Sequence, residues 1–274
     1  MVAREQWRRA DSAERAPAVI VAVGNLKGGV GKSTLTVNLA AALAAEGWGA
    51  VIVDTDPQQS AVRWSSDGHL PCDVVGVPIR DVGDARLWVE TVEELRGQEL
   101  FILIDLPAVL EAALAAACML ADTVIVPAPP SGLDIKALTR TMTFVENARR
   151  QRRDMGPIVH FVPSKVPRRG FVFRRPELGL LHELELPLLP PIFEDADHRK
   201  AVDLGRWVGQ TAPRSAACRD IVTLRDATLA ALARHRSLPA KHGLGGGRAQ
   251  AFRLAQQPPA PQGLGVSRPL RASV

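Results

Sequence analysis

The sequence predicts a doubly wound α/β fold, with a mostly parallel sheet flanked by helices. Six short runs rich in Val and Ile lack polar alternation, as expected for strands buried on both faces. Helix-length segments separate most of these runs, which favours right-handed crossovers and a parallel sheet. The expected strands are Ala18–Val23, Ala50–Asp54, Asp73–Val77, Leu100–Asp105, Thr123–Pro127 and Pro157–Val162. The expected helices are Ser33–Glu46, Asp84–Leu95, Val109–Leu120, Leu133–Arg150 and a final one over roughly Ser215–Arg236.

Length and composition indicate one folded domain. The chain has 274 residues, of which 46% are hydrophobic, and its 3 cysteines form no C-x-x-C pair, which argues against a disulfide scaffold or a zinc ribbon. The charged N-terminus argues against a secretory signal, and no run approaches the ~20 apolar residues of a membrane helix. We therefore expect a cytoplasmic protein with a mobile arm at 1–16, a domain at 17–237 and a disordered, basic, Pro/Gly-rich tail at 238–274.

Positive charge is concentrated in two parts of the chain. Five basic residues and no acids follow Ser237, and they account for the whole net charge of +5. Within the domain, nine basic residues and only one acid, Asp154, lie between Arg149 and Arg175. This asymmetry predicts a surface that binds a polyanion.

The strongest motif is GNLKGGVGKST, which runs from Gly24 to Thr34 between an expected strand and an expected helix. Its glycines allow backbone N–H groups to wrap closely around phosphate oxygens, and the following helix directs its positive end at the same anion. Lys32 would add a charge near the β- and γ-phosphates, and the Ser33 hydroxyl is placed to ligate Mg²⁺. The motif therefore predicts a nucleoside triphosphate site.

The sequence departs from the usual phosphate loop at Leu26 and carries an additional lysine, Lys27. KGGVGKST resembles the deviant Walker A loop of the ParA/MinD family of ATPases. The resemblance covers about residues 18–236 and is greatest to small ParA-type partition ATPases without an N-terminal helix-turn-helix, in keeping with the short segment before the first strand. It implies a P-loop fold in which Lys27 reaches across a dimer interface to the partner's nucleotide, like an arginine finger in trans.

The same resemblance assigns roles to acidic residues that follow two expected strands. In the run DTDPQ, Asp56 matches the position that orients the attacking water or the Mg²⁺ shell, whereas Asp54 is interpreted as structural. Asp105 ends the Walker B strand and would hold Mg²⁺. The implied catalytic residues are Lys27, Lys32 and Asp56, and the metal ligands are Ser33, Asp56 and Asp105. The nucleotide-binding residues are Lys27, Gly28, Gly29, Val30, Gly31, Lys32, Ser33, Thr34, Ser164 and Lys165, the last two beside the adenine, with Pro190–Ile192 on its other side.

The resemblance further implies a switch driven by ATP and Mg²⁺. ATP would join two protomers as a homodimer, which binds DNA without sequence specificity and positions a plasmid, a chromosome locus or another cargo on the nucleoid. A partner or adaptor protein would stimulate a weak hydrolysis of ATP to ADP and phosphate. The expected DNA-binding residues are Arg168, Arg169, Arg174 and Arg175, with Arg149–Arg153 as a second candidate.

Two alternatives belong to other functional classes. A MinD-like regulator on membranes would need a terminal amphipathic helix, which the Pro- and Gly-rich tail does not supply, so we expect no membrane binding. The other alternative is a metabolic P-loop enzyme. An amide ligase would have no use for Lys27. A nitrogenase-type reductase would need a cluster cysteine soon after Asp105, and the sequence has none between Asp105 and Ala117.

Overall fold

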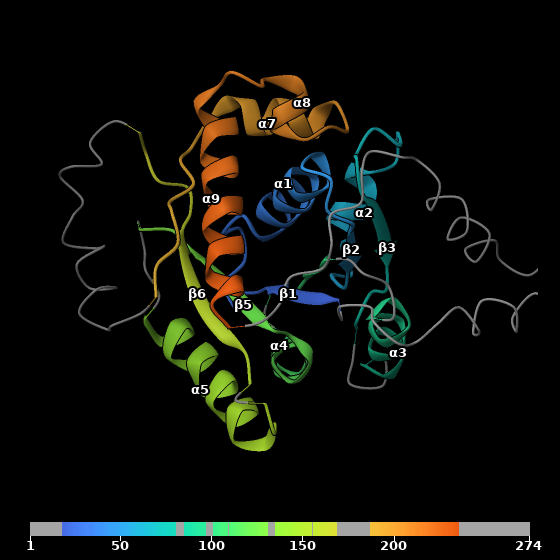
Figure 1. Cartoon of the computed structure of the whole chain (residues 1–274), viewed down its shortest axis with the longest axis vertical. Helices are drawn as coiled ribbons and strands as arrows, with labels where there is room; N and C mark the ends of the chain where they lie inside the picture. The colour runs from blue at the N-terminus through green and yellow to red at the C-terminus, as the bar shows by residue number, and fades with distance from the viewer. Residues whose placement is uncertain are drawn as a thin grey trace, which may run out of the picture. The chain divides into compact units, whose positions relative to one another are not determined.

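A computed structural model contains a parallel sheet of six strands between two layers of helices (Figure 1). It describes residues 18–80, 85–96, 101–108, 110–130, 135–154, 156–168 and 187–235. The expected arm at 1–16 and tail at 238–274 lie outside this range. The strands are β1 (Val19–Val23), β2 (Ala50–Asp54), β3 (Asp73–Gly76), β4 (Phe101–Asp105), β5 (Thr123–Ala128) and β6 (Ile158–Pro163).

The strand order is β3-β2-β4-β1-β5-β6, and every neighbouring pair is parallel. Every residue of β1 and β4 is buried, which explains why these segments are unbroken apolar runs. β1 lies between β4 and β5, with Val23 paired with Asp105. The fold class predicted from the sequence is confirmed, and the register brings the ends of β1, β2 and β4 together at one edge.

Two groups of helices cover the sheet. In Figure 1, α1 and α9 lie on one side of the sheet, whereas α3, α4 and α5 lie on the other. On the first side, apolar residues of α1, such as Leu39 and Leu43, share a buried core with Ile221 and Leu224 of α9. The long helices are α1 (Lys32–Ala45), α3 (Ala85–Arg96), α4 (Glu111–Leu120), α5 (Ile135–Gln151) and α9 (Ala216–Ala233). The short ones are α2 (Ser60–Trp64), α7 (Ala196–Asp203) and α8 (Val208–Thr211).

The boundaries differ from expectation where local chemistry intervenes. β6 begins at Ile158, whose N–H donates to the Asp122 carbonyl, because Pro157 has no N–H to offer. α9 ends at Ala233, and the expected end at Arg236 lies outside the described residues. The three short helices were not expected, since segments of four to eight residues are too short to show a helical period. No helix in the described ranges combines the length and apolarity required to cross a bilayer.

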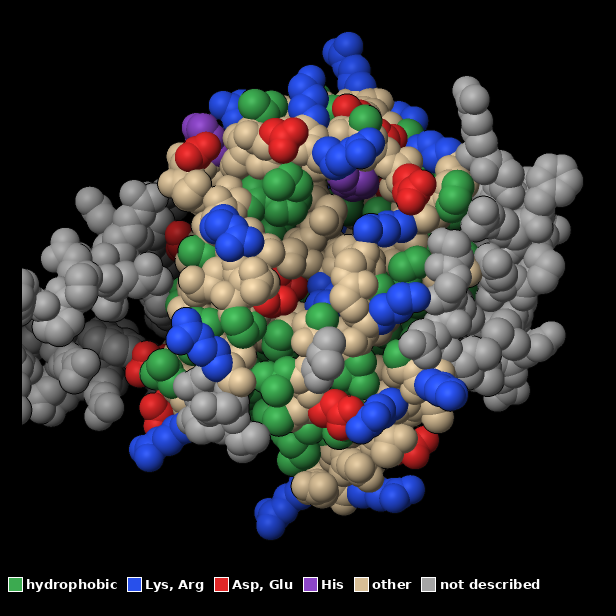
Figure 2. All heavy atoms as spheres, turned by 180° about the vertical axis from the view of Figure 1, so that it is seen from behind, with side chains coloured by type: hydrophobic (Ala, Val, Ile, Leu, Met, Phe, Trp, Pro, Cys, Tyr) green, Lys and Arg blue, Asp and Glu red, His purple; other side chains and the backbone are tan. Residues whose placement is uncertain are grey.

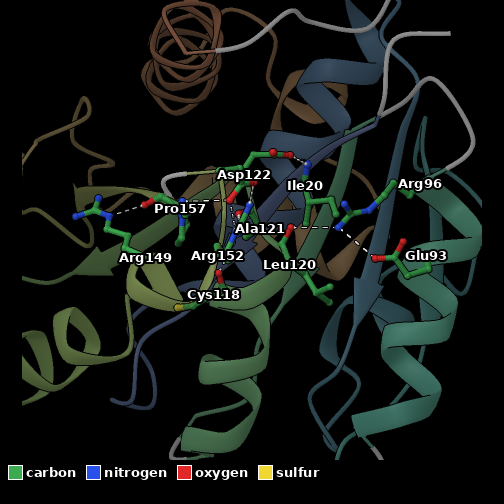
Figure 3. Close-up of polar contacts among 12 residues, drawn as sticks. Ile20, Glu93, Arg96, Cys118, Leu120, Ala121, Asp122, Arg149, Arg152 and Pro157 are labelled. Atoms are coloured by element: carbon green, nitrogen blue, oxygen red, sulfur yellow. Dashed lines mark hydrogen bonds and ion pairs between the residues drawn. The ribbon is translucent and has the colours of Figure 1, made fainter. Parts of the chain in front are cut away.

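Arginines from two neighbouring helices bind the C-terminal end of α4, at the edge where the strands begin (Figure 3). Arg152, just after α5, donates to the carbonyls of Cys118 (3.1 Å) and Ala121, and Arg96 at the end of α3 donates to Leu120 (3.4 Å). These carbonyls have no partner within the helix, so cations here satisfy them and offset the negative end of the helix dipole. Arg152 is therefore a structural residue.

We predict that Arg152→Ala lowers the free energy of unfolding by roughly 1–3 kcal/mol, because buried carbonyls lose charged donors. Urea denaturation measures this change. Arg153→Ala is the matched control, since Arg153 is exposed, and it should change stability by no more than about 0.5 kcal/mol. Equal stability of the two variants would show that Arg152 does not hold α4.

Candidate nucleotide-binding site

The loop between β1 and α1 has the backbone that its glycines predict. Gly29 (φ 70°) and Gly31 (φ 94°) adopt left-handed conformations that strain any residue with a Cβ atom. Gly24, where the chain leaves β1, has no room for a larger residue, since a Cβ atom would lie 2.8 Å from the Leu106 side chain. The loop therefore curls tightly before α1 begins at Lys32.

Asn25 fixes this loop to the sheet, a role that we did not predict. Its side-chain amide donates to the carbonyl of Pro127 in β5 (2.8 Å), and its Oδ1 accepts from the backbone N–H of Lys27 (2.9 Å). The Lys27 side chain is half-buried. Asparagine commonly bonds to the backbone two residues on, so the GN pair after a strand was the available signal.

Lys32 is buried inside the loop, with 7% of its surface exposed. Its Nζ lies 3.4 Å from the Lys27 carbonyl, so the ammonium is held against the loop's own backbone. Burial lowers the pKa of Lys32, whereas the nearby carboxylates of Asp105 and Asp56 raise it. The site thus combines a buried cation with the N-terminus of α1, the combination that binds phosphate.

Asp105, the last residue of β4, is fully buried. Its Oδ1 accepts a long hydrogen bond from the Thr36 hydroxyl (3.4 Å), and its Oδ2 has no hydrogen-bond partner among the described residues. Burial raises the pKa of Asp105 to about 7, against the opposing effect of the Ser33 side chain, while Asp54 adds to the rise. A buried oxygen without a partner beside a serine hydroxyl fits a site for Mg²⁺, which Ser33 and Asp105 would hold.

The two acids of the DTDPQ run have different environments. Asp54 is fully buried, and its carboxylate accepts from the backbone N–H groups of Asp56, Ala61 and Val62 at 2.9–3.1 Å. It therefore anchors the N-terminus of α2, which agrees with the structural interpretation. Asp56 is only half-buried, its Oδ1 accepts from Gln58, and its charge acts on both Lys32 and Asp105. Of the two acids, Asp56 is the one placed to face a ligand.

A cavity of about 500 Å³ adjoins the loop. Ser164, just after β6, lines this cavity. Its hydroxyl donates to the Val30 carbonyl (2.9 Å), which ties the loop to the segment that follows the edge strand β6. Lys165, with a left-handed backbone (φ 51°), lines the cavity too, as does Ile192. Of the residues expected beside the adenine, Ser164, Lys165 and Ile192 thus share one cavity, and Pro190 and Pro191 are not part of its wall. Its walls also include Val30, Gly31, Thr34, Leu35, Phe193, Glu194, Asp195, Ala196, His198, Arg199 and Ile221.

The residues expected to bind DNA are only partly described. Arg169, Arg174 and Arg175 lie outside the described residues. Arg168 forms ion pairs with Asp195 (3.2 Å) and Asp220 (2.7 Å). Its guanidinium also lies 4.9 Å from the Phe193 ring centre. The charge of Arg168 is therefore balanced within the fold, against the wall of the cavity.

The second basic candidate, Arg149–Arg153, does not form a uniform cationic face. Arg152 binds α4, and Arg149 donates to the Pro157 carbonyl (3.1 Å), as Figure 3 shows. Arg150 and Arg153 are exposed. On the face drawn in Figure 2, Lys and Arg side chains are spread out and mixed with acidic and apolar ones, not gathered in one patch.

A sequence model of a known family matches residues 21–206, from β1 through the loop, both acidic motifs and the cavity. That model describes the CobQ/CobB/MinD/ParA nucleotide-binding domain. The chain belongs to this family. The maintenance of carboxysome distribution protein A of Gloeobacter kilaueensis is 42% identical to it over 123 residues, or 45% of this chain and 55% of that protein.

Other relatives within the family are named for positioning or partition. The carboxysome distribution protein A of Halothiobacillus neapolitanus is 34% identical over 48% of this chain and 61% of its own length. Protein ParA of Rhizobium radiobacter is 31% identical over 42% of this chain and 50% of its own length. The matched segments thus span roughly half to three fifths of these relatives.

Solved structures share the fold. A putative plasmid partition protein of Borrelia burgdorferi bound to AMPPNP superimposes with a TM-score of 0.63 at 16% identity, over 78% of this chain and 99% of that one. MinD of Pyrococcus horikoshii, complexed with Mg-ADP, gives 0.59 at 22% identity, over 81% of this chain and 100% of that one. The six-stranded sheet is therefore that of MinD/ParA P-loop proteins.

We predict that Asp105 contributes a loss of stability to the nucleotide-free protein as the pH rises from about 4 to 7, opposite in sign to the contribution of His160, whose pKa burial lowers to about 4. The pKa of Asp105 rises from the ordinary 3.8 to about 7 on folding, so through this group the native state binds more protons than the unfolded state in this window. Asp105→Asn removes this penalty and should raise the free energy of unfolding at pH 8 by about 1–4 kcal/mol. Urea denaturation of wild type and variant at pH 5 and pH 8 measures the difference in their free energies of unfolding.

Asp154→Asn is the matched control with the opposite sign. A hydrogen bond from Arg152 lowers the pKa of Asp154 to about 2, so its charged form stabilises the fold at neutral pH. This variant should be less stable than wild type at pH 8, an effect that solvent exposure of Asp154 keeps small. A destabilised Asp105→Asn variant at pH 8 would contradict the assignment of Asp105 as a strained, buried acid.

Proposed function

We propose that this chain is an ATP-dependent dimerising switch ATPase that binds DNA nonspecifically and positions a cargo. The observation that carries the proposal is Lys27, an additional lysine at the start of a phosphate loop that already contains the buried Lys32. A second cation at this position matches the lysine that the ParA/MinD resemblance assigns to a contact across a dimer interface. Membership of the MinD/ParA family supports the same interpretation.

The residues of the site have complementary roles in binding ATP. The backbone N–H groups of the loop and the N-terminus of α1 bind the phosphates, with Lys32 at their centre. The cavity beside Ser164 and Lys165 accommodates the nucleoside. Ser33 and Asp105 would hold Mg²⁺, which would supply neutralisation of phosphate charge, and Asp56 would orient a water molecule for attack on the γ-phosphate.

Lys27 would make dimerisation depend on the γ-phosphate. Its ammonium from one protomer reaches the triphosphate of the other, so ATP favours the dimer through a contact that ADP does not offer. Hydrolysis then removes this contact and releases the protomers. A partner protein that aligns Lys27 would accelerate hydrolysis, because charge on the leaving phosphoryl group would be neutralised as it develops.

The names of the relatives suggest the kind of cargo. One relative is named for carboxysome distribution and another for chromosome partitioning, and both names describe the placement of a large object in the cell. DNA binding without sequence specificity needs only cations that meet phosphates. We assign this contact to Arg169, Arg174 and Arg175, because Arg168 is already paired with Asp195 and Asp220.

We predict that wild-type protein is a dimer with ATP and a monomer with ADP, and that Lys27→Ala loses this difference. Hydrolysis of ATP by the variant should fall at least about tenfold, as expected when a cation at a transferring phosphoryl group is removed. Size-exclusion chromatography with light scattering and a phosphate-release assay measure both quantities.

Arg153→Ala serves as the control, since this exposed cation lies near the edge of the sheet opposite the loop and should leave both assays unchanged. Full hydrolysis by Lys27→Ala, or an ATP-dependent dimer of that variant, would refute the role of Lys27. ATP-dependent binding of the wild type to liposomes would favour a membrane regulator instead.

We predict that changing Arg169, Arg174 and Arg175 together to Ala weakens binding to DNA of any sequence. The slope of log affinity against log salt should fall by about 0.9 for each DNA phosphate that the variant no longer neutralises. Arg168 is left in place so that the cavity wall stays intact. The matched control is the double variant Arg150→Ala with Arg153→Ala. If the salt slope fell in this control and stayed unchanged in the triple variant, the DNA contact would lie at the end of α5.

A further inference from the structure

His198 is a buried residue whose chemistry the loop and the acidic motifs leave unexplained. It lies on α7 with 8% of its surface exposed, and both of its ring nitrogens are buried without a hydrogen-bond partner in the described part of the chain. A neutral imidazole has one N–H donor and one acceptor nitrogen, and leaving either unpaired in the interior costs about 1–3 kcal/mol. Such a group indicates a partner that binds later.

The cavity is the place where that partner can bind. His198 forms part of its wall, together with residues 192–195, which precede α7, and with Ser164 and Lys165, which follow β6. The phosphate loop, through Val30 and Gly31, forms another part of the wall. A molecule that places its triphosphate in the loop thus extends its nucleoside toward α7.

Burial keeps His198 neutral, and an ion-pair network fixes the start of its helix. Asp195 caps α7 by accepting from the Asp197 N–H (3.1 Å), and Arg168 pairs with both Asp195 and Asp220. Burial lowers the pKa of His198, Arg168 lowers it further, and Asp195, Asp220 and Asp197 oppose the change. The ring is therefore uncharged at neutral pH and keeps both a donor and an acceptor.

We propose that His198 contacts the nucleoside of the bound nucleotide and hydrogen-bonds to it through a ring nitrogen. This inference rests on the proposed function, since it takes the cavity to be the nucleoside part of an ATP site. It adds a binding residue from α7, outside the loop and the acidic motifs. It also explains why a buried polar side chain occupies a position where a leucine would stabilise the empty protein.

The test compares His198→Leu with wild type by calorimetric titration of Mg-ATP and of inorganic tripolyphosphate. The leucine side chain is similar in size to that of histidine but is apolar and has no ring nitrogen. We expect ATP affinity to fall about tenfold, the size of one lost hydrogen bond to a buried group, while tripolyphosphate affinity stays within about twofold. The melting temperature of the nucleotide-free variant should equal or exceed that of wild type, since an unpaired polar group is removed.

Two further variants complete the test. His198→Gln retains a donor and an acceptor and should bind ATP within about threefold of wild type. His160→Leu is the matched control, because His160 is another buried histidine whose Nδ1 lies 3.2 Å from the Thr123 hydroxyl, and it does not line the cavity. It should bind ATP normally but lower the melting temperature.

Two results would overturn the inference. One is a His198→Leu variant that binds ATP as wild type does; the other is one that loses ATP affinity, tripolyphosphate affinity and thermal stability together, as a merely structural residue would. Failure of the proposed function gives a different result, since wild-type protein would then bind neither ATP nor tripolyphosphate.

Discussion

The proximity of a buried lysine and a buried aspartate is the constraint on which the rest of the site depends. Lys32 and Asp105 are 7% and 0% exposed, and each alters the pKa of the other. Two buried ionisable groups are costly unless their partners are complete, and here Oδ2 of Asp105 has none among the described residues. The fold holds these groups in place through the strand pairing of β1, β2 and β4 and through Thr55, which donates twice to the Asp105 carbonyl. A metal ion and a triphosphate would satisfy both charges, so binding would relieve a cost built into the empty protein.

The two edges of the sheet use cations in different ways. At the edge where the strands end, Lys32 and Lys27 belong to a loop shaped to surround an anion. At the opposite edge, Arg96 and Arg152 bind carbonyls at the end of α4 and are part of the fold. A count of charges along the chain cannot separate these uses, because a cation bound to a carbonyl and a cation facing solvent look the same in sequence. An arginine already bound to carbonyls or carboxylates of the fold is therefore a poorer candidate for DNA binding.

Much of the fold was predictable because strands buried on both faces require unbroken apolar runs, and all six expected strands exist. The phosphate loop was predictable because only glycine tolerates the backbone of positions 29 and 31. Asn25 and His198 were not, since their roles depend on Pro127 and on a cavity whose walls come from distant parts of the chain. The contacts of Arg149 and Arg152 were not predictable either, because the carbonyls that they bind belong to segments outside their own helix; DNA binding by Arg149–Arg153 stays a prediction.

The central claim is that a lysine from one protomer meets the triphosphate held by the other. A crystal structure with a non-hydrolysable ATP analogue and Mg²⁺ tests it most directly. We expect two protomers facing each other across the nucleotides, with Nζ of Lys27 within hydrogen-bonding distance of phosphate oxygens bound by the second loop. A single protomer, or a dimer in which Lys27 points away from both nucleotides, would contradict it.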